Sequence, residues 1–306
     1  MLNFATNETI TLNIFVCIKQ VPGIRSDIIP NDKANYIDTT KLRWIISPED
    51  DCAVEQALQI REQFPDSSIT ALRVGIEKHS EPLIDAMAMG ADDSILVLAK
   101  EELLDPHMTA KAIKAAIERS GKKPDIILCG NGSIDNESCQ VPQILAQMFC
   151  FPCVTRVIDV CMNNREPELK RQIEDGKIET YWTNLPIVVA CKDGLNVPRY
   201  APLPFIEQAK QKPMLKLSLD EIGVNTNDQR LRYSNFRLPQ TKQEDKSIYN
   251  YSLSSLVEAI LTQLSLFLPN KKSRKIFNAS NRNDVDNVVT EVIEILRADI
   301  KSLQRD

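Results

Sequence analysis

Short apolar runs rich in β-branched residues alternate with helical patterns through the first two thirds of this 306-residue chain, and this alternation limits the folds open to it. An apolar run without polar alternation is typical of a strand that is buried on both faces. Five runs fit this description, at residues 13–18, 69–74, 95–98, 126–129 and 187–190. Helical patterns occupy residues 47–64, 81–89, 108–119 and 143–149. Strands that alternate with helices in this way predict an α/β fold, with helices on both faces of a parallel sheet.

The first of these helices has a well-marked start. Ser47 is suited to the N-cap position and Pro48 to the first helical position. Three carboxylates follow in the first turn, Glu49, Asp50 and Asp51, where the helix dipole favours negative charge. Asp50 and Asp51 are adjacent in sequence and point in different directions from a helix, so they are not expected to act as an acid–base pair.

Two parts of the chain depart from the alternation of strands and helices. Residues 153–182 alternate around Asp175-Gly176, a strong hairpin dipeptide, and predict an antiparallel excursion. Residues 229–306 carry 13 Lys and Arg against 9 Asp and Glu and contain two helical patterns with apolar stripes. We therefore expect an α/β domain over residues 1–228, followed by a linker and a helical tail that packs on the body or on another protein.

Composition narrows the class of protein further. A net charge of −5 argues against a nucleic-acid-binding function. No apolar run approaches the roughly 20 residues that cross a bilayer, so direct membrane insertion is not expected. The first residues lack the pattern of a secretory signal, and most of the eight cysteines lie inside apolar runs, as buried thiols do in a reducing compartment. These features favour a cytoplasmic protein.

The segment that follows the fourth buried strand carries the clearest sign of a ligand site. Residues 129–133 read C-G-N-G-S, residues 135–138 read D-N-E-S, and a helix is predicted next. Small residues between a strand and a helix can hold a phosphate with backbone N–H groups, although loops of this composition are also common as plain structural connections. The usual dinucleotide and P-loop signatures are absent, as are the usual catalytic motifs and a zinc-type ligand set, so the sequence predicts neither a catalytic residue nor a metal site.

Several motifs in series resemble the electron transfer flavoprotein β subunit. Residues 13–22 (N-I-F-V-C-I-K-Q-V-P) are similar to its opening strand, which typically reads V-x-V-K-x-V-P. Ser47-Pro48 followed by A-V-E-Q-A resembles N-P followed by A-V-E-E-A, and residues 89–92 read M-G-A-D as in the family. Residues 130–146 resemble the loop G-K-Q-A-I-D-x-D-x-x-Q-V-G-Q-M-L-A, and residues 194–204 resemble L-N-E-P-R-Y-A-x-L-P.

This resemblance implies a Rossmann-like α/β domain that pairs with a larger α subunit and carries electrons without catalysing a reaction of its own. It implies FAD near the subunit interface, AMP in the β subunit, acyl-CoA or related dehydrogenases as donors, and a quinone-linked oxidoreductase as acceptor. The implied nucleotide contacts are Cys17, Ser47, Val74, Gly130, Asn131, Gly132, Ser133, Ile134, Asp135, Ser138, Gln140 and Val141. The implied partner-docking residues are Leu195, Asn196, Arg199, Tyr200 and Leu203.

The chain departs from the family pattern at positions close to the implied ligand. Pro142 replaces a glycine and has no N–H to offer a phosphate, and residues 131–133 replace K-Q-A, which removes a lysine. Glu49 adds a negative charge where the family often has an apolar residue, and Val197 replaces a glutamate. Three alternatives to the AMP-binding subunit therefore stay open: a bifurcating-type subunit with a second FAD in place of AMP, a nucleotide-binding module without redox function, and a β site kept empty for assembly only.

Overall fold

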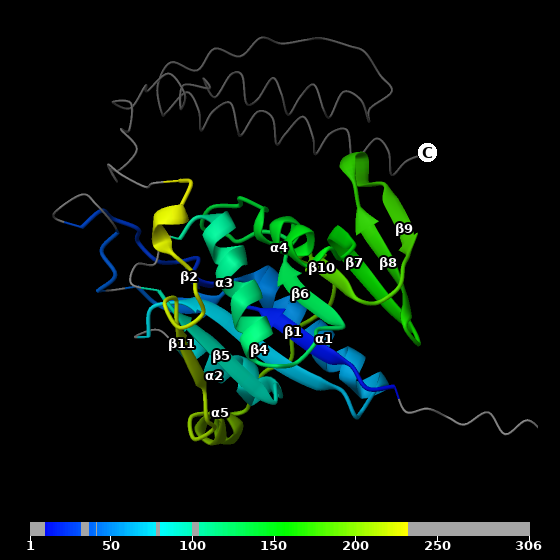
Figure 1. Cartoon of the computed structure of the whole chain (residues 1–306), viewed down its shortest axis with the longest axis horizontal. Helices are drawn as coiled ribbons and strands as arrows, with labels where there is room; N and C mark the ends of the chain where they lie inside the picture. Colours follow the sequence, from blue (N-terminus) through cyan, green and yellow to red (C-terminus); the bar gives the residue numbers. More distant parts are fainter. Residues whose placement is uncertain (1–9, 32–36, 41, 78–79, 100–103, 232–306) are drawn as a thin grey trace, which may run out of the picture. The chain divides into compact units, whose positions relative to one another are not determined.

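The computed structural model describes residues 10–31, 37–40, 42–77, 80–99 and 104–231, which form an α/β domain around a nine-stranded sheet (Figure 1). The order of the strands is β11-β5-β4-β1-β6-β10-β7-β8-β9, and every pairing from β11 to β7 is parallel. These strands are β1 (Asn13–Cys17), β4 (Ser68–Gly75), β5 (Asp93–Leu98), β6 (Ile126–Gly130), β7 (Cys153–Asn163), β10 (Ile187–Cys191) and β11 (Leu215–Ser218). The predicted parallel sheet is thus confirmed.

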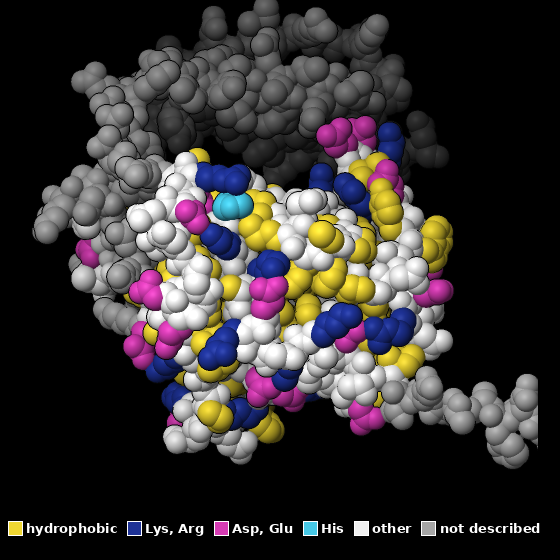
Figure 2. Space-filling model, in the orientation of Figure 1, with side chains coloured by type: hydrophobic (Ala, Val, Ile, Leu, Met, Phe, Trp, Pro, Cys, Tyr) yellow, Lys and Arg dark blue, Asp and Glu magenta, His cyan; other side chains and the backbone are white. Residues whose placement is uncertain are grey.

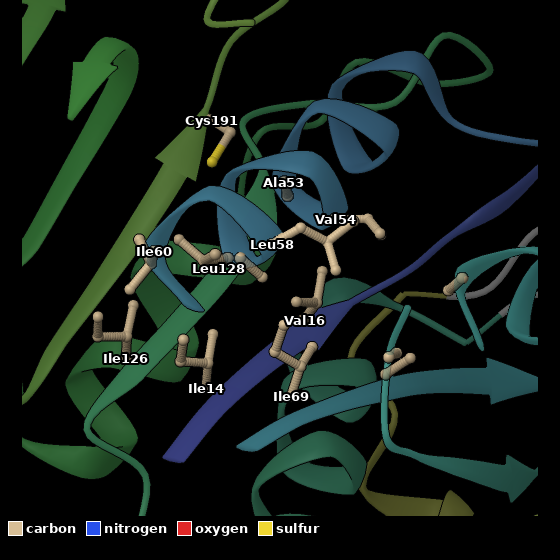
Figure 3. Packing of buried hydrophobic residues seen from close by; sticks show 14 of the residues in the cluster. Ile14, Val16, Ala53, Val54, Leu58, Ile60, Ile69, Ile126, Leu128 and Cys191 are labelled. Atoms are coloured by element: carbon tan, nitrogen blue, oxygen red, sulfur yellow. The ribbon is translucent and has the colours of Figure 1, made fainter. Parts of the chain in front are cut away.

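Helices cover both faces of the sheet, as predicted. On one face, α1 (Pro48–Gln63), α2 (Glu81–Met89) and α5 (Leu203–Ala209) contribute to one apolar cluster, and on the other, α3 (Pro106–Arg119) and α4 (Val141–Phe149) contribute to a second. Figure 3 shows α1 over β1 and β6, with Val54 and Leu58 directed at Val16 and Leu128. These side chains are almost fully excluded from water, which supplies the main stabilising free energy of such a layer.

The antiparallel excursion is also present. Strands β8 (Glu166–Gln172) and β9 (Ile178–Trp182) follow β7 and pair antiparallel, which extends the sheet at one edge. Asp175 and Gly176 have φ values of 58° and 70° in the connecting turn, the left-handed conformation that this dipeptide favours. A separate two-stranded sheet pairs β2 (Gln20–Pro22) antiparallel with β3 (Trp44–Ile46).

One helix boundary and one strand of the main sheet differ from the sequence-based expectation. Helix α4 begins at Val141, two residues earlier than the expected start at residue 143, so Pro142 lies within the helix, at its second position. Strand β11 was not predicted because its segment, L-K-L-S, alternates between apolar and polar residues over only four positions, the lower limit for recognising a strand. The predicted helical tail over residues 229–306 lies almost wholly outside the described residues, which end at Leu231. Among the helices described, none is long and apolar enough to span a bilayer.

Candidate functional site

A cavity of about 810 Å³ lies at the carboxyl ends of β1, β4 and β6, the edge where open parallel sheets bind ligands. Its apolar wall includes Leu72 and Ile113, and its polar groups come mainly from the segments that follow the three strands. Eleven of the twelve predicted nucleotide contacts line this one cavity. They are Cys17, Val74, Gly130, Asn131, Gly132, Ser133, Ile134, Asp135, Ser138, Gln140 and Val141.

Ser47, the twelfth predicted contact, lies elsewhere. It occupies the N-cap position of α1, as predicted, but its side chain makes no capping hydrogen bond. The residue is fully buried, and its hydroxyl has no hydrogen-bond partner within the described part of the chain. Ser47 is therefore not among the residues that line the cavity.

Asp50 joins the two loops that form the polar side of the cavity. Its carboxylate accepts hydrogen bonds from the backbone N–H of Lys19, at 2.8 Å after β1, and of Gly130, at 2.6 Å at the end of β6. Burial raises the pKa of Asp50 to about 7, against the lowering effect of these two N–H donors. The acidic first turn of α1 thus has a long-range role that its position in the helix alone did not reveal.

Glu49 holds the next part of the same loop. Its carboxylate accepts a hydrogen bond from the backbone N–H of Gly132 at 2.5 Å, while the N–H of Asn131 donates to the carbonyl oxygen of Cys191 at 2.8 Å. The N–H groups of residues 130–132 therefore all have acceptors within this chain. Because such N–H groups were the predicted phosphate donors, this part of the loop differs from an open phosphate cradle.

Lys19 crosses from the β1 loop to the β6 loop on the cavity wall. Its ammonium group lies 2.7 Å from Asp135 and donates to the hydroxyl of Ser133 at 3.0 Å. The Ser133 hydroxyl also lies 2.6 Å from Asp135. Asp135 is therefore engaged by this chain's own lysine. Lys19 lies in the segment that resembles V-K-x-V-P, and this motif is the sequence signal that could have identified it as a residue of the cavity.

Two thiols lie side by side on the floor of the cavity. Cys17 is the last residue of β1 and Cys129 the last but one of the neighbouring strand β6, each one residue beyond the paired Val16 and Leu128. A hydrogen bond with Cys17, together with burial, raises the pKa of the Cys129 thiol well above its ordinary value. A thiol with a raised pKa is a poor nucleophile, so this floor is suited to contact with a ligand rather than to covalent chemistry.

The predicted docking segment is fixed to α1 by Arg199. The guanidinium donates to both carboxylate oxygens of Glu55, at 2.7 and 2.9 Å, and to Glu62 at 2.8 Å. The Arg199 backbone N–H donates to Glu55 as well, at 3.1 Å. Burial would raise the pKa of Glu55, but the hydrogen bonds from Arg199 outweigh burial and hold this pKa below its ordinary value.

The other predicted docking residues divide into a half-buried pair and an exposed pair. Leu195 packs against the core, and the Asn196 amide donates to the carbonyl oxygen of Cys52 at 3.0 Å. Tyr200 is 95% exposed and Leu203, which begins α5, is 70% exposed. The inner residues anchor the segment, and the outer ones present apolar side chains to solvent.

Hydrophobic side chains also gather elsewhere on the surface. Figure 2 shows them over α4 and along β9, where Ile178 is 57% and Trp182 is 71% exposed. Strand β9 is the last strand of the sheet, so its exposed side chains form an apolar edge. Apolar surface of this kind is typical of contact with another protein.

The fold and the cavity place this chain among open α/β proteins that bind ligands at the carboxyl ends of parallel strands. The family described as "Electron transfer flavoprotein domain" matches residues 35–222. The Bacillus subtilis electron transfer flavoprotein subunit beta is 34% identical over 71% of this chain and 83% of its own length. The chain therefore belongs to the electron transfer flavoprotein β-subunit family, whose role is electron transfer.

Other relatives show the breadth of this similarity. The electron transfer flavoprotein subunit beta of Dictyostelium discoideum is 32% identical over 71% of this chain and 85% of its own length. The caffeyl-CoA reductase-Etf complex subunit CarD of Acetobacterium woodii is 31% identical over 70% of this chain and 81% of its own length. The resemblance inferred from sequence motifs is thus confirmed.

Proposed function

We propose that this chain is the β subunit of a heterodimeric electron transfer flavoprotein, which holds AMP in its own cavity and shares FAD with an α subunit. In this proposal the complex accepts electrons from acyl-CoA-type or related dehydrogenases, passes them to a quinone-linked oxidoreductase, and works in the cytoplasm. One observation supports the binding of a nucleotide most strongly. Eleven motif residues, which come from three separate segments of the sequence, line the same cavity.

The cavity suits the nucleoside part of an adenine nucleotide. Its volume of about 810 Å³ falls within the range of roughly 300–1,000 Å³ that small-molecule and cofactor sites occupy. Apolar side chains such as Leu72, Val74 and Ile113 offer a surface for a planar base, and polar loop residues such as Ser138 and Gln140 offer hydrogen bonds. Bound flavin would supply the redox chemistry, while this chain's residues bind the nucleotide and present the docking segment.

The exposed apolar residues of the docking segment support the proposal that this chain binds a partner protein. Leu203 follows Pro202, and Arg199 fixes the same segment to α1, so its exposed side chains are held in place before a partner arrives. Such pre-organisation reduces the entropy lost on docking. The names of two relatives, the caffeyl-CoA reductase-Etf complex subunit and an acryloyl-CoA reductase electron transfer subunit gamma of Anaerotignum propionicum, support an acyl-CoA-type enzyme as the partner.

A second candidate is a bifurcating-type subunit that binds a second FAD in this cavity. The cavity's size, near the upper end of the usual range, favours it. The two candidates predict different ligands in the same place, which makes them separable by analysis of the bound molecules.

The test is to purify the full chain with its α-type partner and to quantify the nucleotides released on denaturation. We expect FAD and AMP in near-equal amounts, and expect Val74→Trp, which fills the cavity, to remove AMP while the complex keeps one FAD. Lys210→Trp, at an exposed position remote from the cavity lining, is the control. Two flavins without AMP would establish the second candidate, and a colourless complex without nucleotide would refute both.

A further inference from the structure

The two-stranded β2–β3 sheet forms one wall of the cavity. Gln20 and Pro22 of β2 and Trp44 of β3 line the cavity. Gly23 and Ile24, which directly follow β2, line it as well. The two strands pair with each other and belong to a different sheet from β1, β4 and β6. Strand pairing therefore does not hold this wall on the main sheet, and side-chain contacts across the gap acquire that role.

Arg73 makes such a contact from the end of β4. Its Nη2 group donates a hydrogen bond to the Oε1 atom of Gln20 at 2.5 Å, and its Nη1 group donates to the carbonyl oxygen of Ile76 at 3.1 Å. The first bond reaches the β2–β3 sheet, and the second returns to the segment that follows β4. Only 3% of Arg73 is exposed, and a hydrogen bond from a charged guanidinium is stronger than one between neutral groups. Arg73 thus fastens the β2–β3 sheet to the main sheet.

The same end of β4 also supplies a predicted ligand contact. Side chains alternate along a strand, so Arg73 and its neighbour Val74 point to opposite faces of the sheet. Val74 packs against the apolar cluster to which α3 and α4 contribute, and it lines the cavity. Two adjacent residues of β4 therefore connect the ligand side of the cavity with the wall that the β2–β3 sheet forms.

The place of the guanidinium depends on Gly75. A Cβ atom added to Gly75 would lie 2.6 Å from Nη2 and 2.9 Å from Cζ of Arg73, and its three nearest atoms would all belong to this guanidinium. Gly75 is not among the glycines with a positive φ, so its backbone also accommodates alanine. Gly75→Ala should therefore displace the guanidinium from Gln20 while the charge of Arg73 is kept.

We propose that Arg73 is a positioning residue, which fastens the β2–β3 sheet over the bound ligand through Gln20 and thereby sets the rate of ligand exchange. When the contact breaks, the β2–β3 sheet moves away from the end of β4, and the ligand enters or leaves. When the contact forms again, the cavity is closed. Arg73 acts on the ligand only through this wall. The inference rests on the proposed function, since it assumes an adenine nucleotide in the cavity.

The test measures the release and the uptake of radiolabelled AMP by the complex of the full chain and its α-type partner. Arg73→Met removes the donors, Gln20→Leu removes the acceptor, and Gly75→Ala displaces the guanidinium. We expect the rate constants of release and uptake both to rise about tenfold in each variant, the equivalent of about 1.4 kcal/mol in the opening equilibrium. The Kd for AMP should change less than threefold, because a cavity that opens more often both fills and empties faster.

A double variant and a matched control make the test specific. Arg73→Met combined with Gln20→Leu should exchange AMP no faster than the faster single variant, since both substitutions remove the same hydrogen bond. Arg61→Met is the control, because the guanidinium of Arg61 also donates to a side-chain oxygen, that of Asp92 at 3.0 Å, and Arg61 lies outside the cavity lining. This variant should exchange AMP at the rates of the unaltered chain.

The outcomes separate this inference from the function on which it rests. Unchanged exchange rates in Arg73→Met and Gln20→Leu, with AMP still bound, would overturn the role of Arg73 and leave the nucleotide site intact. A raised Kd with unchanged uptake would also overturn it, because Arg73 would then contact the ligand itself. Additive effects in the double variant, or equal effects in Arg61→Met, would overturn it as well.

Two further results have a defined meaning. If Arg73→Met does not assemble with the partner, Gln20→Leu and Gly75→Ala decide the question, since both keep the buried charge. If no form of the complex binds AMP, the proposed nucleotide site is wrong and the inference falls with it.

Discussion

Replacing Asp50 by asparagine should change how the stability of this fold depends on pH. The Asp50 carboxyl group is buried, and burial raises its pKa from an ordinary value of 3.8 to about 7. A carboxyl group whose pKa is raised on folding binds more protons in the folded than in the unfolded state between these two values. Its contribution to stability is therefore complete below pH 3.8 and is lost as the pH rises through 7.

The size of this effect follows from the two pKa values. Each pKa unit corresponds to about 1.4 kcal/mol, and about two of the roughly three units of difference are lost between pH 5 and pH 8. The free energy of unfolding should therefore fall by about 3 kcal/mol over this interval because of Asp50 alone. An asparagine cannot ionise, so Asp50→Asn should lack this part of the pH dependence.

Urea denaturation at pH 5 and pH 8 measures the difference directly, and Asp66→Asn, at an exposed position just beyond α1, is the matched control. Asp50→Asn should become more stable relative to the unaltered chain by about 3 kcal/mol on going from pH 5 to pH 8. An unchanged difference between the two chains at the two pH values would refute the reasoning, because the Asp50 carboxyl would then titrate alike in the folded and unfolded states.

Two more substitutions test the contacts around the site. Gly130→Ala should lower the free energy of unfolding by about 2 kcal/mol, because its Cβ would lie 2.6 Å from the Asp50 carboxylate and force it to move; a change below about 0.5 kcal/mol in urea denaturation would contradict this. Arg199→Ala should lower the free energy of unfolding by about 2 kcal/mol. The loss is smaller than for a fully buried ion pair, because the arginine side chain is 39% exposed. The same substitution should speed proteolysis within residues 195–204. If the cleavage rate there stays the same, the ion pair with Glu55 does not fix the segment.

The parallel domain could be predicted from the sequence because its strands carry their own signal. Runs such as residues 14–18 and 187–190 are continuously apolar, and only burial on both faces accommodates such a run. The β8–β9 turn was predictable for a different reason, since Asp175-Gly176 favours the left-handed backbone found there. Local chemistry thus determined both features. The edge strand β11 carried too little pattern to be recognised.

The candidate site was only partly predictable, because its key contacts join distant segments. The loop at residues 130–141 could be located from its small residues, but nothing in the local pattern showed that Asp50 and Glu49 accept hydrogen bonds from it. The acidic first turn was explained equally well by the helix dipole. The same holds for Glu55, whose position in the middle of α1 gave no sign of the pairing with Arg199.

Helix α1 carries contacts to both candidate sites. Glu49 touches the cavity loop and Glu55 touches the docking segment, and six residues of helix separate them by only about 9 Å along the axis. A helix is stiff over such a distance, so a displacement of its first turn is transmitted to the middle of the helix with little loss. The length of α1 thus sets the spacing between the cavity loop and the docking segment, and both are held by side chains of one rigid element.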